Sequence, residues 1–237
     1  MTKAVAYHRP SSIDEAVALL REPGRVVLAG GTVVNDRTVG VTRDSDDEET
    51  VEVVDIQALG LDGMEMEGPL LRIGAATTLQ AMVDNSLVPT LLRHLARAEL
   101  PSTLRNTATL GGLCAVGDGG SPLLAGLLVH GTEATTAGPN GELITSFTIA
   151  VDGAGAWSGT GRTPADSPIV AAVARQDAAG EVHLALTGVS RRPVVVDPTD
   201  PVAGLDPPAD FRGSAEYRIE LARIHTSRVL AELGAGG

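Results

Sequence analysis

Two pairs of consecutive glycines, Gly30-Gly31 and Gly111-Gly112, constrain the fold more than any other feature of this sequence. The first pair follows the short apolar run at 25–28, and the second follows the segment that ends at Leu110. Glycine is needed where φ must be positive or where the backbone comes very close to another group. We therefore expect two sharp backbone turns, and the 28 glycines among 237 residues indicate that such positions are frequent in this chain.

Consecutive backbone amides in such turns form concave sites that bind anions. Two turns that converge suit a pyrophosphate, and the hydroxyls of Thr32 and Thr109 flank the two glycine pairs. An ordinary tight turn explains each pair equally well, so the residues alone leave both interpretations open. The chain has no Rossmann fingerprint and no P-loop, because no G-x-G-x-x-G opens a helix and Gly-Lys-Ser/Thr is absent.

Charge and cysteine content exclude several classes of protein. The formal net charge is −12, which argues against nucleic-acid partners and against an anionic membrane surface. A single cysteine, Cys114, cannot form an intramolecular disulfide, and it cannot build a zinc or iron–sulfur site alone. The sequence contains no apolar run of roughly 18 residues and no apolar signal segment at its start. We therefore predict a cytoplasmic protein without a membrane span.

Capping residues and apolar spacing predict an alternation of short helices and strands. Ser12 and Glu15 form a capping box before one helix, Thr77 or Thr78 caps a second, and Ser121-Pro122 opens a third. The expected helices are 13–20, 79–84, 87–98, 122–129 and 214–233, and the expected strands are 25–28, 51–55, 70–74, 132–137, 142–150, 169–175, 182–187 and 193–196.

Side chains that carry catalysis or bind metals are not conspicuous. No nucleophile lies beside a base, and the five histidines lack the spacing of metal ligands, so we predict no catalytic residue and no metal site. The acidic run at 44–49 is typical of a solvated loop, with metal binding as the alternative. Cys114 follows the second glycine pair and is interpreted as a buried, inert thiol or as a neighbour of a cofactor.

Several segments, in order along the chain, carry a resemblance to a known family. The sequence resembles the FAD-binding subunits of molybdenum hydroxylases of the carbon-monoxide-dehydrogenase and xanthine-dehydrogenase type, within the broader class of flavoproteins that includes vanillyl-alcohol oxidase. The Arg-Asn-x-Ala-Thr-Leu-Gly-Gly stretch is the most specific. The matching segments are 7–10, 28–32, 71–79, 104–112, 142–144, 188–194 and 212–218.

The resemblance implies an α+β fold. Residues 1–150 would form an FAD-binding domain of two subdomains with a boundary near 57, and residues 151–237 a C-terminal domain with a three-stranded sheet and helices. The two glycine loops would hold the FAD pyrophosphate, and the single tryptophan, Trp157, would be a packing residue or a stacking surface for the flavin. The implied cofactor-binding residues are Ala29, Gly30, Gly31, Thr32, Val33, Thr109, Gly111, Gly112, Leu113 and Asp118.

The family role would be electron transfer. A small iron–sulfur subunit would pass electrons from a large molybdopterin subunit to the flavin, which would deliver them to an external acceptor. Three positions depart from the family pattern, because Leu113, Val116 and Pro122 replace polar residues. They favour an alternative in which the chain is a structural or assembly subunit without flavin. A stand-alone flavin reductase is a third hypothesis, and it lacks identifiable catalytic groups.

Overall fold

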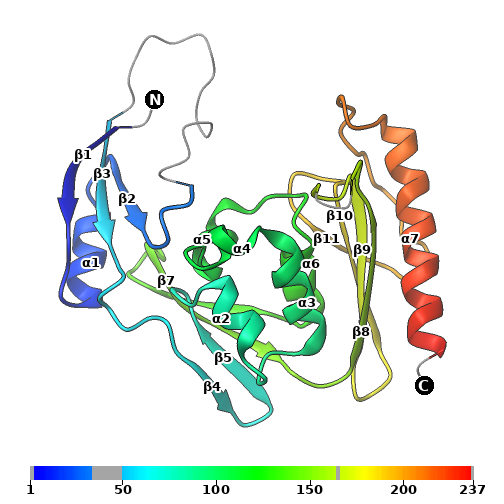
Figure 1. Ribbon diagram of the computed structural model, residues 1–237, viewed down its shortest axis with the longest axis horizontal. Coiled ribbons are helices and arrows are strands. Elements are labelled where there is room, and N and C mark those ends of the chain that lie inside the picture. Colours follow the sequence, from blue (N-terminus) through cyan, green and yellow to red (C-terminus); the bar gives the residue numbers. More distant parts are fainter. Residues whose placement is uncertain (1–2, 34–49, 164–165, 236–237) are drawn as a thin grey trace.

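The computed structural model describes residues 3–33, 50–163 and 166–235. The predicted acidic loop lies outside these residues, as does the part of the first glycine loop after Val33. The chain forms three parts that follow one another along the molecule (Figure 1): a small sheet with one helix, a second sheet with a group of short helices, and a third sheet backed by one long helix.

The first part is a parallel three-stranded sheet in the order β1-β3-β2. Its strands are β1 (Lys3–His8), β2 (Arg25–Leu28) and β3 (Thr50–Asp55), and helix α1 (Ile13–Leu20) lies between β1 and β2 in the sequence. Ser12 caps α1 as predicted, because its hydroxyl accepts a hydrogen bond from the Glu15 amide at 3.2 Å. The sequence analysis did not predict β1, which extends the sheet by pairing with β3.

The second part is an antiparallel sheet in the order β4-β5-β7-β6, covered by short helices. The predicted caps are confirmed: Thr78 caps α2, and Ser121 caps α6 with Pro122 at its first position. The strands are β4 (Met64–Glu67), β5 (Leu70–Gly74), β6 (Glu133–Ala137) and β7 (Leu143–Ala150), and the helices are α2 (Leu79–Asp84), α3 (Thr90–Glu99), α4 (Ser102–Arg105), α5 (Leu110–Val116) and α6 (Pro122–Val129).

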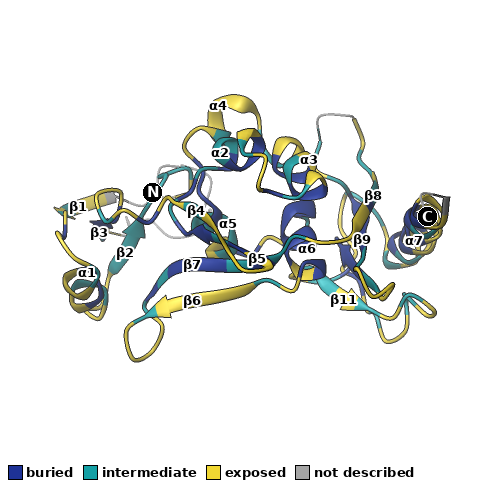
Figure 2. Ribbon diagram, turned by 90° about the horizontal axis from the view of Figure 1, so that it is seen from below, coloured by how far each residue is buried: buried dark blue, intermediate teal, exposed yellow. Residues whose placement is uncertain are grey.

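Helix α6 is buried on nearly all sides, as its dark colour in Figure 2 shows. Its sequence is apolar at almost every position, which is typical of a helix enclosed by other elements rather than of a surface helix. It packs against α3 on one side and against the third sheet on the other. The main core of the molecule therefore runs from the second sheet through these helices to the third sheet.

The third part is an antiparallel sheet in the order β11-β10-β9-β8, with α7 (Ala215–Ala235) on one face. It has four strands rather than the predicted three, because β8 (Ala154–Thr160) pairs along the whole of β9 (Val170–Gln176). The two glycines of β8 obscure this strand in the sequence, because glycine has little preference for strands. The remaining strands are β10 (Val182–Thr187) and β11 (Val194–Val196). No described helix is both long and apolar enough to cross a membrane.

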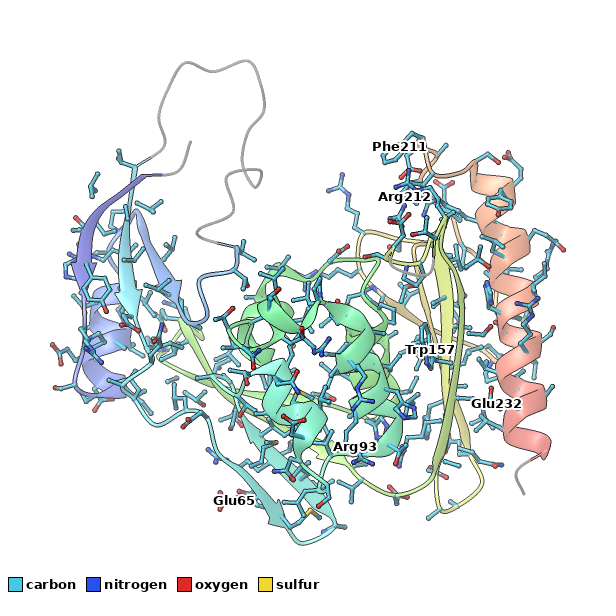
Figure 3. All side chains as sticks on the ribbon, viewed as in Figure 1. Glu65, Arg93, Trp157, Phe211, Arg212 and Glu232 are labelled. Atoms are coloured by element: carbon cyan, nitrogen blue, oxygen red, sulfur yellow. The ribbon has the colours of Figure 1, made fainter. Side chains whose placement is uncertain are left out.

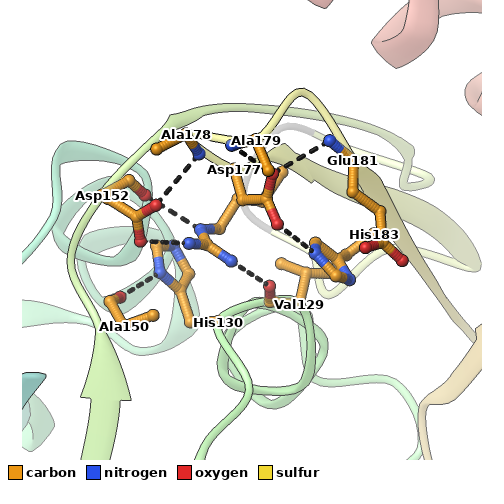
Figure 4. Close-up of polar contacts among 10 residues, drawn as sticks. Val129, His130, Ala150, Asp152, Asp177, Ala178, Ala179, Glu181 and His183 are labelled. Carbon is orange, nitrogen blue, oxygen red and sulfur yellow. Dashed lines mark hydrogen bonds and ion pairs between the residues drawn. The ribbon is translucent and has the colours of Figure 1, made fainter.

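A buried arginine ties the third sheet to the second part (Figure 4). Arg175 on β9 donates through Nη1 to the carbonyl of Val129 at 3.3 Å and through Nε to the carbonyl of Asp152 at 2.9 Å. Its Nη2 also pairs with the Asp152 carboxylate, whose other oxygen accepts from the Ala178 amide at 3.0 Å. We call these contacts of Arg175 the arginine clasp.

Candidate cofactor site

A pocket of about 470 Å³ opens between the first and second parts of the molecule. Its floor and walls are mostly apolar, with a few backbone and hydroxyl groups, which is the usual composition of a site for a small organic ligand. We call it the apolar pocket. The residues that surround it are Val27, Ala29, Gly30, Gly31, Thr32, Val33, Ile56, Ala75, Thr109, Gly111, Gly112, Ala115, Val116, Gly141, Glu142, Leu143 and Ile144.

The first glycine loop, residues 30–33, follows β2 and borders this pocket. Gly31 has a φ of +70°, which a residue with a side chain rarely adopts. Gly30 is required for a different reason: a Cβ on it would lie 1.7 Å from the carbonyl oxygen of Thr107. The loop therefore touches the segment that leads into the second glycine pair, and the predicted convergence of the two glycine segments is confirmed.

The expectation of a sharp backbone turn at the second glycine pair is wrong. Gly111 and Gly112 instead lie in the first turn of helix α5. Thr109 caps this helix, since its hydroxyl accepts from the Gly112 amide at 3.2 Å. The amide of Gly111 donates to the carbonyl of Ala75 at 2.8 Å, and a Cβ on Gly111 would lie 2.8 Å from that same oxygen. Close packing of α5 on the end of β5 thus requires glycine here.

The two glycine segments differ in the hydrogen bonds that they leave available. At α5, the amides of Leu110, Gly111, Gly112 and Leu113 all donate to protein oxygens. At the first glycine loop, the amides of residues 30–33 make no hydrogen bond to another described residue. Among the residues that the structure describes, the first loop is therefore the main source of backbone donors for an anionic ligand, and the Thr109 hydroxyl remains able to donate from the second.

A second pocket, of about 240 Å³, also borders the start of the first glycine loop. It shares Ala29, Gly30 and Thr109 with the apolar pocket, but most of its other residues are polar. We call it the polar pocket. Its remaining residues are Gln57, Asp62, Ala76, Thr78, Asn106 and Thr107.

Glu142 is the charged side chain that borders the apolar pocket. Burial raises the pKa of this carboxyl, but hydrogen bonds from its own amide and from Asn140, together with the nearby Arg21 guanidinium, outweigh burial and leave the pKa below its ordinary value. Arg21 lies 3.3 Å from the carboxylate. An ionised carboxylate only accepts hydrogen bonds, so Glu142 suits the hydroxyl or amino groups of a ligand rather than its phosphates.

Eight of the ten predicted cofactor-binding residues surround the apolar pocket, and two do not. Leu113 packs against the core of the second part, on the other side of α5. Asp118 lies beyond the end of α5, where its carboxylate accepts from the Gly120 amide at 2.9 Å. Of the departures from the family pattern, only Val116 borders the pocket, whereas Pro122 is buried at the start of α6. Neither Leu113 nor Pro122 obstructs the space between the loops.

Other residues singled out in the sequence have structural roles. Cys114 is half-buried and borders a separate pocket of about 200 Å³ rather than the apolar pocket, and burial raises the pKa of its thiol to about 12, which favours the inert interpretation. Trp157 on β8 packs against the main core (Figure 3) and does not border the apolar pocket. Asp177, Glu181 and His183 approach one another in the β9–β10 hairpin. There the Asp177 carboxylate binds amides of the hairpin turn.

The fold and the pocket together define a class of protein: an α+β protein with a largely apolar pocket, bordered by glycine segments, that suits a small organic ligand. Comparison with known families specifies the cofactor. Residues 3–152 match the family described as the FAD binding domain in molybdopterin dehydrogenase.

Individual relatives extend this similarity to the whole chain. The medium chain of carbon monoxide dehydrogenase from Afipia carboxidovorans is 28% identical in an alignment of 276 positions, gaps included, which covers 94% of each chain. Reconstituted CO dehydrogenase from Oligotropha carboxidovorans is 25% identical with a TM-score of 0.84 over 99% of both chains. Carbon monoxide dehydrogenase from Hydrogenophaga pseudoflava shares the fold, with a TM-score of 0.87 over 99% of both chains at 22% identity.

The chain belongs to the family of FAD-binding medium subunits of molybdenum hydroxylases, and it is an oxidoreductase subunit whose cofactor is FAD. The described residues fit this cofactor, because no described residue accepts a hydrogen bond from the amides of the first glycine loop and Gly30 brings this loop close to the second segment. A side chain at position 30 would force this loop away from Thr107.

Sequence reasoning missed one polar residue that contacts this site. Gln57 follows β3, and its side-chain amide donates to the carbonyl of Ala29 at 2.7 Å. A single glutamine after a strand has no distinctive pattern, so no sequence signal marked it.

Proposed function

We propose that this chain holds FAD between its two glycine segments and relays electrons through it to an external acceptor. The observation that carries the proposal is the convergence of Gly30 on Thr107, which places backbone amides without a described partner at the border of a pocket of about 470 Å³. Bound FAD supplies the redox chemistry, and the role of the protein is to bind and orient it.

Each group around the pocket has a distinct task in this proposal. The amides of the first glycine loop and the hydroxyls of Thr32 and Thr109 donate to the diphosphate. The carboxylate of Glu142 accepts from hydroxyl or amino groups, and apolar side chains such as Ile56 and Ile144 exclude water from the flat rings. Leu113 and Asp118 contribute through the position of α5 rather than by contact, since neither borders the pocket.

The same proposal includes partners, because the relatives named as medium chains are parts of larger enzymes. We place this chain between a small iron–sulfur subunit and a large molybdopterin subunit, in the cytoplasm. We also place a domain boundary near residue 151 and a subdomain boundary near residue 57, after the last strand of the first sheet. The end of the family match at residue 152 supports the former division.

An assembly subunit without flavin is the second candidate. The observation that favours it is that all four amides at the start of α5 already have protein partners, so the second segment offers few donors. A stand-alone reductase has less support, since we find no acid–base pair beside the apolar pocket among the described residues.

Absorption spectroscopy with FAD titration separates these candidates. The purified chain is expected to carry the two visible bands of oxidised flavin, or to acquire them when FAD is added, and to release FAD on Gly30→Ala substitution. Gly63→Ala is the matched control, because a Cβ on Gly63 meets no atom within 4 Å. A colourless chain that does not bind excess FAD would overturn the flavin role and leave the assembly function as the better candidate. Electron relay requires reduction of the bound flavin in the purified complex with its partner subunits.

A further inference from the structure

We infer that Gln57 is a positioning residue, which orients the first glycine loop for FAD by holding the carbonyl of Ala29. This inference rests on the proposed function and adds to it the residue that sets the direction of a backbone donor. The contact is a hydrogen bond of 2.7 Å from Gln57 Nε2 to Ala29 O. Since a carbonyl oxygen only accepts, the nitrogen of the glutamine amide must face it.

The position of Gln57 is itself fixed by the strand that precedes it. The Asp55 carboxylate is buried at the end of β3. One of its oxygens accepts a hydrogen bond from the backbone amide of Gln57 at 2.9 Å, and the other accepts from the Tyr7 hydroxyl. The amide of Ile56 also donates to Leu28 at 3.1 Å, which continues the pairing of β3 with β2. The backbone at Gln57 is therefore held from two sides before its side chain reaches Ala29.

The held carbonyl determines where the next amide points. The Ala29–Gly30 peptide is trans, as are all the described peptides, so its C=O and N–H point in opposite directions. With the carbonyl directed at Gln57 in the polar pocket, the amide of Gly30 points away from Gln57. That amide has no other described partner, and Gly30 borders both pockets. Gln57 thus presents a backbone donor to the ligand without contacting the diphosphate itself.

The experiment measures the FAD dissociation constant and the Gly30 amide resonance in the ligand-free chain, for wild type and Gln57→Met. Methionine keeps the length of the side chain and removes the donor. We expect Gln57→Met to weaken FAD binding about 3- to 10-fold, the range for loss of one hydrogen bond, and to shift the Gly30 amide resonance. Unchanged affinity together with an unchanged resonance would overturn the inference.

A pH profile distinguishes positioning from a general loss of structure. In Gln57→Glu, the neutral acid can donate to Ala29 whereas the carboxylate cannot, and an ordinary glutamate titrates near about pH 4.3. The carboxylates of Asp55 and Asp62, which face this position, raise that pKa further. FAD affinity of Gln57→Glu relative to Gln57→Met should therefore rise as the pH falls from 7.5 towards the pKa of this glutamate, by up to the same about 3- to 10-fold.

Protonation of any carboxylate near the diphosphate would also strengthen FAD binding as the pH falls, even without a hydrogen bond to Ala29. Asn106→Asp is the control, because it places a carboxyl group in the same polar pocket without a bond to Ala29. Equal pH profiles for Asn106→Asp and Gln57→Glu would overturn the positioning role. If wild type fails to bind FAD, the proposed function is wrong, and the Gly30 resonance alone then decides whether Gln57 orients the loop.

Discussion

The two junctions of this molecule are built on different principles. At the first junction, between the first and second parts, backbone meets backbone at Gly30 and Thr107, and two pockets open beside the contact. At the second junction, between the helices and the third sheet, apolar side chains interlock and the arginine clasp joins Arg175 to Val129 and Asp152. A contact between main chains leaves room for a ligand around it, whereas interlocked side chains fill the space.

Because the two junctions differ in this way, we expect FAD affinity to depend on the first junction and not on the second. Substitutions at the first junction should change FAD affinity along with folding, because the same backbone forms the pocket. Substitutions at the second junction should change only the free energy of unfolding. The predictions below test that separation, beginning with the substitution of largest expected effect.

Arg175→Met should lower the free energy of unfolding by about 3–4 kcal/mol, because each carbonyl oxygen that loses its donor costs about 1–3 kcal/mol. Two carbonyl oxygens lose their donor in this variant, that of Val129 at a buried position and that of Asp152 at a partly buried one. Urea unfolding at pH 7.5 measures the change. FAD affinity of the folded variant should equal that of wild type, and a loss of affinity would contradict the separation. Arg223→Met, which removes an exposed arginine in a weak ion pair, is the control and should cost less than about 0.5 kcal/mol.

Gly30→Ala should lower the free energy of unfolding by about 3 kcal/mol, the upper range for forcing extra atoms into a packed site. A methyl group here would overlap the Thr107 oxygen, so the two segments must move apart. In contrast to Arg175→Met, this variant should also lose FAD binding, as monitored by flavin fluorescence. Retention of wild-type affinity in Gly30→Ala would show that the first junction does not form the cofactor site.

Acid should weaken the second junction through His130. Its Nδ1 donates to the carbonyl of Ala150 at 2.7 Å, while its Nε2 is buried with no partner in the described part of the chain. Burial, together with the positive charge of Arg175, lowers the pKa of His130 from 6.5 to about 4. Between pH 6.5 and pH 4 the unfolded chain binds a proton that the folded chain refuses, so the free energy of unfolding falls as pH falls.

The total loss from this proton should approach about 3 kcal/mol at the acid end of that interval. Urea unfolding across the interval measures it, with His130→Gln as the variant in which the residue no longer titrates. The pH dependence of His130→Gln should be shallower by that amount. Parallel pH profiles for the two proteins would show that His130 is not held neutral at this junction.

The sequence predicted those features that depend on local chemistry. Thr78 and Ser121 cap helices because each hydroxyl accepts a hydrogen bond from a backbone amide three residues later in the sequence. The glycine pairs mark the places where two main chains approach closely. Strand β8 was missed because its glycines have little preference for strands, and only pairing with β9 makes it one. Helix α5 was missed because glycine also disfavours helices, and α5 contains two consecutive glycines near its start.

Side-chain contacts between distant segments were beyond prediction. Arg175 and Gln57 carry no local pattern, and their roles come from carbonyl groups that are 46 and 28 positions away in the sequence. Eight of the ten predicted site residues surround the pocket. They belong to two short segments, and each segment contains a glycine at a place where the backbone comes too close to another main chain for a side chain. The two residues away from the pocket, Leu113 and Asp118, were included by position in the motif, which does not report which face of a helix is buried.

The smallest predicted effect distinguishes the two glycines of the second pair. Gly112→Ala should change the free energy of unfolding by less than about 0.5 kcal/mol, because alanine favours a helix by about 0.5–1 kcal/mol and this gain offsets a tight contact of 3.1 Å with the Thr109 hydroxyl. Gly111→Ala should instead destabilise by about 1–3 kcal/mol, since its methyl group would meet the Ala75 carbonyl at 2.8 Å. Urea unfolding of both variants tests the order. If Gly112→Ala were the more damaging, packing on Ala75 would not be the reason for the pair, and a free turn at these residues would again be the better description.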